Sequence, residues 1–154
     1  MKVEELKKRY AAFEGLYKLP GFAELNADFE IENIRKGEEL LLRTIRKNMM
    51  TKIVNSLGFV EVLLNPMNAP RMYFAYIKSM GTEDKKGIEK IYSVLSDLVF
   101  ASLELEVDYS EKEEAEMIKK IVRDWSSIKP SFKGIIKNMQ KPVSSVSKEK
   151  SYFG

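Results

Sequence analysis

The sequence contains no cysteine and no histidine in 154 residues. The absence of cysteine excludes disulfides, thiolate nucleophiles and thiolate zinc sites. The absence of histidine excludes the usual general base near neutral pH, and it removes the imidazole ligands of zinc, haem and di-iron sites. Because these two side chains carry much of enzyme chemistry, we expect a protein that is not an enzyme and that holds no cofactor.

Long uncharged stretches are also missing. The longest covers nine residues, 62–70, whereas a helix needs about 20 apolar residues to cross a bilayer. The first ten residues are too charged for a signal peptide. We therefore expect no membrane partner and a cytoplasmic location. A single glutamine and many lysines and glutamates are typical of thermophile proteins, although eight methionines fit that origin less well.

What the chain does contain is the composition of a globular protein. Hydrophobic residues make up 44%, charged residues 32% and aromatic residues 10%, a balance that excludes disorder over most of the length. We expect one helical domain over residues 1–141. The segment 142–154 has no helical or strand periodicity, which predicts a flexible C-terminal tail.

Apolar side chains recur every three or four residues in several stretches, which is the pattern of amphipathic helices. The pattern predicts a helix over 3–18, stopped by Pro20, and a partly helical connection over 22–36. A longer helix is expected to begin after Gly37 and to run at least to Ser56.

Two further helices have recognisable beginnings. Thr82 is a plausible N-cap for a helix of five or six turns, and Ser110 with Glu113 forms a capping box for the next. The link between them is short, which predicts antiparallel packing. Pro130 is expected to end the second of these helices, and a short last helix then follows, with Phe132 on its apolar side.

The stretch 57–80 allows two interpretations. In the first, 59–78 forms a β-hairpin, and "NSLGFV" then resembles the end of the recognition helix in a winged-helix module, which implies an α+β fold. In the second, the preceding helix continues to Pro66 and another helix starts after Asn68, with Pro70 in its first turn. We favour the second, because an isolated hairpin is only marginally stable. The predicted fold is therefore all-α, an antiparallel bundle of five or six helices.

The charge is unevenly distributed along the chain. Residues 81–128 carry seven basic and twelve acidic side chains, net −5, whereas residues 129–154 carry six and one, net +5. The acidic side chains gather between Glu104 and Glu116. This asymmetry predicts that the basic segment packs on the acidic one, in the same chain or in a second copy; a basic arm for nucleic acid is the alternative.

Two groups of basic side chains are candidates for nucleic-acid contact. The first is a lysine ladder, in which a lysine recurs at every fourth residue: Lys129, Lys133, Lys137 and Lys141. The second lies on the helix that follows Gly37: Arg43, Arg46, Lys47 and Lys52. Such rows can neutralise phosphates and release counterions, but the solvated side of any amphipathic helix looks the same, and we favour that interpretation. Three aromatic side chains beside Arg71 and Lys78 could stack on bases, although packing is the commoner role: Tyr73, Phe74 and Tyr76.

Carboxylates are the remaining metal ligands. Glu113 and Glu116 share one helix face, and Glu104 with Asp108 forms a second pair at i, i+4 spacing. Together they could hold Mg²⁺, as in all-α magnesium-dependent nucleotide hydrolases. The helix dipole and capping explain first-turn glutamates more simply.

Three functions remain, in order of preference. The first is a non-enzymatic module for protein interaction or assembly, with a protein partner or a second copy in a homodimer. The second is a small nucleic-acid-binding protein that uses the lysine ladder, and the third is the magnesium-dependent hydrolase.

Overall fold

The computed structural model describes residues 1–35 and 40–141; segments 36–39 and 142–154, which include the predicted tail, lie outside the described residues. The described residues contain six α-helices and three short 3₁₀-helices, and no strand occurs among them. The prediction of an all-α bundle of five or six helices is confirmed. The elements, in chain order, are α1 (Val3–Tyr17), α2 (Phe22–Phe29), η1 (Ile31–Asn33), α3 (Leu41–Leu64), η2 (Pro66–Asn68), η3 (Arg71–Tyr73), α4 (Phe74–Ser79), α5 (Thr82–Val107) and α6 (Glu111–Met139).

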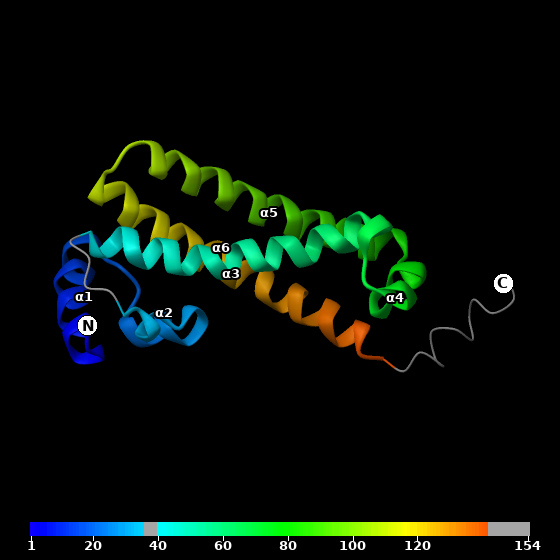
Figure 1. Ribbon diagram of the computed structural model, residues 1–154, viewed down its shortest axis with the longest axis horizontal. Helices are drawn as coiled ribbons and strands as arrows, with labels where there is room; N and C mark the ends of the chain where they lie inside the picture. Colours follow the sequence, from blue (N-terminus) through cyan, green and yellow to red (C-terminus); the bar gives the residue numbers. More distant parts are fainter. Residues whose placement is uncertain (36–39, 142–154) are drawn as a thin grey trace, which may run out of the picture.

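Three long helices, α3, α5 and α6, make the body of the bundle. Each contacts the other two, and they run alternately up and down, with α4 at the turn from α3 to α5 (Figure 1). Their inward faces carry a continuous row of buried apolar side chains, among them Ile45, Leu95 and Ile121. The bundle therefore has one core, shared by all three helices.

The two N-terminal helices cover one end of this body. Helix α1 ends where Lys18 takes a left-handed backbone conformation, and α2 ends in the same way at Glu30. The Tyr10 hydroxyl is buried and donates to the carbonyl of Pro20, which fixes the turn between the helices. Burial, together with Glu14 and Glu24, raises the pKa of Tyr10 well above its usual value.

The hairpin interpretation of residues 59–78 is wrong. The resemblance to a winged-helix module depended on that hairpin and is therefore wrong as well. Helix α3 passes through Gly58 without interruption, because Val60 and Leu63 continue its buried face. The Phe59 ring packs against Phe132, with their centroids 5.6 Å apart. Helix α3 ends at Leu64, before Pro66, as the second interpretation expected, and Pro66 then begins a 3₁₀ turn.

The prediction that Pro130 ends a helix is also wrong. Helix α6 is 29 residues long and continues through Pro130 to Met139, so the residues expected to form a short last helix are its C-terminal part. A proline inside a helix leaves the carbonyl four residues earlier without its donor. Here that residue is Ser126, which is exposed, as is Pro130, so water can replace the missing N–H. The continuous packing of Ile128 and Phe132 against the bundle outweighs the lost bond.

The helix starts agree closely with the prediction. Ser110 is the N-cap of α6, and its Oγ accepts from the Glu113 N–H at 3.3 Å. Helix α5 begins at Thr82, with Gly81 as the N-cap, and the Gly81 N–H donates to Asp84 Oδ2 at 3.1 Å. The cap is therefore one residue earlier than expected, because the Asp84 carboxylate supplies the bond.

Candidate functional surfaces

The lysine ladder lies on the outer side of α6, and its members have different surroundings. Lys133, Lys137 and Lys141 are exposed. Lys129 is held instead by an ion pair of 2.6 Å with Asp28 at the end of α2. Within the described part of the chain, three of the four lysines remain open to a phosphate.

Of the second basic group, only Lys52 is brought beside the ladder, because Lys52 and Lys129 both contact Asp28. Arg46 is 1% exposed and lies inside the bundle, where no phosphate can reach it. Arg43 and Lys47 both face Glu106, at 2.8 and 3.7 Å. Lys52 lies 5.2 Å above the Trp125 ring, and its ammonium donates to the Asp28 carbonyl. The interpretation of this group as a phosphate-binding row is corrected: its charges are used within the fold, because α5 and α6 present carboxylates and rings to α3.

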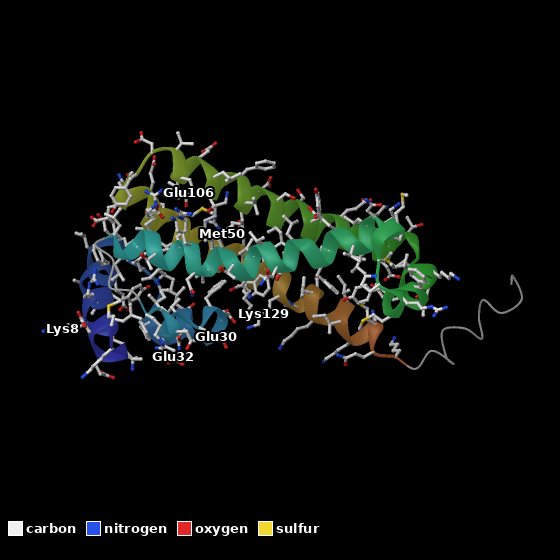
Figure 2. The ribbon with its side chains drawn as sticks, viewed as in Figure 1. Lys8, Glu30, Glu32, Met50, Glu106 and Lys129 are labelled. Carbon is white, nitrogen blue, oxygen red and sulfur yellow. The ribbon has the colours of Figure 1, made fainter. Side chains whose placement is uncertain are left out.

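Arg46 is the centre of a buried charge cluster that ties the three long helices together. Its Nε donates to Glu114 Oε2 of α6 at 2.6 Å, and its Nη1 donates to Ser102 Oγ of α5 at 2.7 Å. Its Nη2 donates to Glu106 Oε1 of α5 at 2.8 Å. The Glu114 side chain is completely buried, whereas Glu106 is 35% exposed at the rim. Figure 2 shows Glu106 near the turn between α5 and α6.

The electrostatics of the cluster favour its ionised form. Burial alone lowers the pKa of Arg46, but hydrogen bonds with Glu114 and Glu106 outweigh it and raise the pKa overall. The Arg43 hydrogen bond, assisted by Arg46 and Lys47, lowers the pKa of Glu106 to about 2. The Arg46 guanidinium makes four hydrogen bonds inside the fold and is 1% exposed, so we interpret the cluster as structural.

The four carboxylates predicted to hold magnesium are not brought together. Glu104, Asp108, Glu113 and Glu116 are all exposed, and Glu116 pairs with Lys119 at 2.7 Å. Among residues 1–35 and 40–141, no three acidic side chains converge as metal ligands would. The orientation of α6 about its own axis explains why the predicted magnesium site does not form. It directs Glu114 inward to Arg46 and leaves Glu113 and Glu116 on the outside.

The three aromatics suggested for base stacking are divided between core and surface. Tyr76 is buried, Tyr73 packs edge-on against Phe59 with centroids 5.8 Å apart, and Phe74 is exposed. They do not form one stacking platform.

The acidic and basic segments do not pack on each other within the described chain. Along α6, Glu113 and Lys137 lie 24 residues apart, which is about 36 Å at 1.5 Å per residue. The acidic end is neutralised by α3, through Arg43 and Arg46. For residues 129–141, the expectation of packing inside one chain is therefore corrected, whereas 142–154 lie outside the described residues; pairing with a second copy stays open.

A groove of about 510 Å³ lies between α2, α3 and α6. Phe29, Phe59 and Phe132 supply its apolar surface, and amide and hydroxyl side chains of α3 line one wall, among them Thr51 and Asn55. Asp28 and Glu30 lie at the α2 end together with Lys52, and Figure 2 shows Glu30 and Lys129 below α3. No sequence pattern marked this groove, because it joins residues more than 100 positions apart.

The outer face of α5 carries an apolar stripe, which we define as Phe100, Leu103 and Val107. These side chains are 67%, 55% and 86% exposed. Their spacing of three and four residues aligns them on one side of the helix, opposite the buried Leu98, Ser102 and Leu105. The stripe is about 10 Å long at 1.5 Å per residue.

The chain matches no protein-family model, no curated protein and no solved structure. Within the described residues, no helix combines the length and apolar character that crossing a membrane requires. The candidate functions therefore depend on the geometry of the groove and of the apolar stripe.

Proposed function

We propose that the protein is a non-enzymatic assembly module that pairs with a second copy of itself through the outer face of α5. The observation that carries the proposal is the exposed apolar stripe. Folding does not require it, because the opposite face of α5 already supplies the core. Large apolar side chains gathered on one exposed face mark interaction sites.

The charges beside the stripe favour a second copy as the partner. Lys86 and Lys90 lie on the N-terminal half of α5, Glu104 lies near its C-terminal end, and Asp108 follows as the C-cap; all four are exposed. At 100° per residue the three helical residues share one flank of the helix, and Asp108 continues beyond its end. In an antiparallel pair the same flanks meet, so basic residues of one copy face acidic residues of the other.

The register of such a pair follows from the spacing. Lys90 and Glu104 lie seven residues on either side of Asp97, and Lys86 and Asp108 lie eleven residues on either side. A two-fold axis at Asp97 therefore aligns both pairs at once, twice per dimer. The same register places Phe100 near Ser93 and Ser96 of the second copy, which are small enough to receive the ring. This register also brings the two Asp97 side chains toward each other at the two-fold axis, and their like charges repel.

Charge reversal tests this pairing. In Lys90→Glu or Glu104→Lys, like charges meet at two symmetric sites, and at roughly 1 kcal/mol per site the dimer Kd should rise about 30-fold. The double variant Lys90→Glu/Glu104→Lys restores opposite charges and should recover the wild-type Kd. Sedimentation equilibrium between about 1 and 200 µM measures each constant.

Phe100→Ser should weaken the dimer more than 100-fold, because it removes a buried ring from both copies. The matched control is Leu16→Ser, since Leu16 is 68% exposed on α1, outside the stripe. It should leave the Kd unchanged. A chain that sediments as a monomer at 200 µM overturns the proposal, and so does a double charge variant that is no tighter than the single ones.

A further inference from the structure

We propose that the groove between α2, α3 and α6 binds a nucleotide, either free or as one unit of a single strand. The planar base would lie on the phenylalanine rings, and its phosphate would lie on the α6 side. The groove volume of about 510 Å³ is in the range of small-molecule sites, about 300–1,000 Å³.

The aromatic surface of the groove suits a flat ring. Phe59 and Phe132 are half-buried, with centroids 5.6 Å apart and interplanar angle 54°, so part of each ring stays open to the groove. Trp125 packs against both Phe132 and Phe29, with ring centroids 5.9 and 6.4 Å away, and so connects the aromatic side chains of the groove. Base stacking on such rings is tolerant of sequence and contributes strongly to binding.

The α3 wall offers hydrogen-bonding groups at the edge of that ring. Asn55, Thr51 and Ser56 line the groove and carry neutral donors and acceptors. An asparagine amide can pair with the edge of a base through one donor and one acceptor. Asn48 is partly occupied, because its Nδ2 donates to the Phe29 carbonyl at 3.1 Å. Asn55 is exposed and is the better candidate for the base edge.

The charges around the groove give the ligand a direction. Asp28 and Glu30 at the α2 end are balanced by Lys52, which lines the groove and donates to the Asp28 carbonyl, and by Lys129, which pairs with Asp28 at 2.6 Å. On α6, Phe132 and Ile136 line the groove, and the exposed Lys133 follows Phe132 in the sequence, so we infer that its ammonium reaches the α6 rim. The uncompensated positive charge therefore lies on the α6 side, and an anionic group is attracted there. Lys137, one turn further, extends the same positive edge along the ladder.

The test is calorimetric titration of the full chain with AMP, GMP, CMP and UMP, with ten-residue single-stranded oligonucleotides, and with inorganic phosphate as the reference probe. At least one nucleotide should bind with a Kd below about 200 µM, at least ten-fold tighter than phosphate. Asn55→Ala and Lys133→Ala should each weaken binding by about ten-fold or more. The controls are Asn65→Ala and Lys112→Ala, which change the same residue types away from the groove and should bind like the wild type.

The two sources of the nucleotide give different results. A free nucleotide site binds the mononucleotide as tightly as the oligonucleotide, and Lys137→Ala has no effect. A single-strand site binds the oligonucleotide at least ten-fold tighter, with an affinity that falls between 50 and 200 mM salt and on Lys137→Ala. The proposal is overturned if no nucleotide or oligonucleotide binds at 1 mM, or if Asn55→Ala and Lys133→Ala bind like the wild type.

Discussion

Separating the two members of the buried Arg46 and Glu114 pair should cost more stability than removing both. Glu114→Leu leaves a guanidinium that is 1% exposed, with only the rim carboxylate of Glu106 to compensate it. Arg46→Met leaves the fully buried Glu114 carboxylate without its two donors. Breaking a buried pair in this way costs about 3–5 kcal/mol, whereas replacing both partners by apolar residues of similar size is often close to neutral. We therefore expect the free energy of unfolding to fall by about 3 kcal/mol in Glu114→Leu and by about 4 kcal/mol in Arg46→Met. In the double variant Arg46→Met/Glu114→Leu it should stay within about 1 kcal/mol of the wild type.

Urea unfolding followed by circular dichroism measures the free energy of unfolding of the wild type, the two single variants and the double variant, which together form a double-mutant cycle. The variants are best made in a Phe100→Ser background, so that self-association does not contribute to the free energy of unfolding. Arg123→Met is the matched control, because Arg123 is exposed beside Asp124, and it should change the stability by less than about 0.5 kcal/mol. The reasoning is refuted if Glu114→Leu costs less than about 1 kcal/mol, or if the double variant costs as much as the two single ones together.

Two further predictions concern the same helices. Because the pKa of Glu106 is lowered from 4.5 to about 2, its contribution should be fully present above about pH 5 and lost as the pH falls toward 2. The shift corresponds to roughly 3 kcal/mol, which we reduce to about 1 because a third of the side chain is exposed. The difference in unfolding free energy between wild type and Glu106→Gln should therefore disappear between pH 5 and 2, and a constant difference contradicts the assignment. Pro130→Ala restores a donor for the Ser126 carbonyl and should stabilise the protein by about 1–3 kcal/mol. Urea unfolding measures the change, with Ser131→Ala as the control. Destabilisation would instead show that the proline itself positions the end of α6.

The fold was largely predictable because it depends on local signals. The apolar period identified the long helices, and the Ser110 cap placed the start of α6 correctly. The errors arose where packing outweighs a local preference. Pro130 and the Gly58 region both look like helix ends, yet Phe132 and Val60 on either helix are buried or half-buried against the bundle and keep it continuous.

The buried cluster was missed although the sequence carries a signal for it. Arg46 lies four residues after Leu42 and three before Met49, so it falls on the buried face of α3. Glu114 likewise precedes Met117 and Ile118 by three and four residues on the buried face of α6. A single charge on an apolar face predicts a partner of opposite sign on a facing helix. Which two helices face each other is a property of the fold, so the pairing could not be read from the sequence.

The two proposed surfaces are structurally independent. The groove is lined by α2, α3 and α6 and by Asn33 at the end of η1, and no residue of α5 contributes to it. The apolar stripe points away from the core that α3 and α6 share with α5. A dimer formed through α5 therefore leaves both grooves open, one on each copy, and the basic edge of each α6 stays accessible. Under the two proposals, the lysine ladder has a role at the groove and none in assembly, because the charges that would pair the two copies are those of α5.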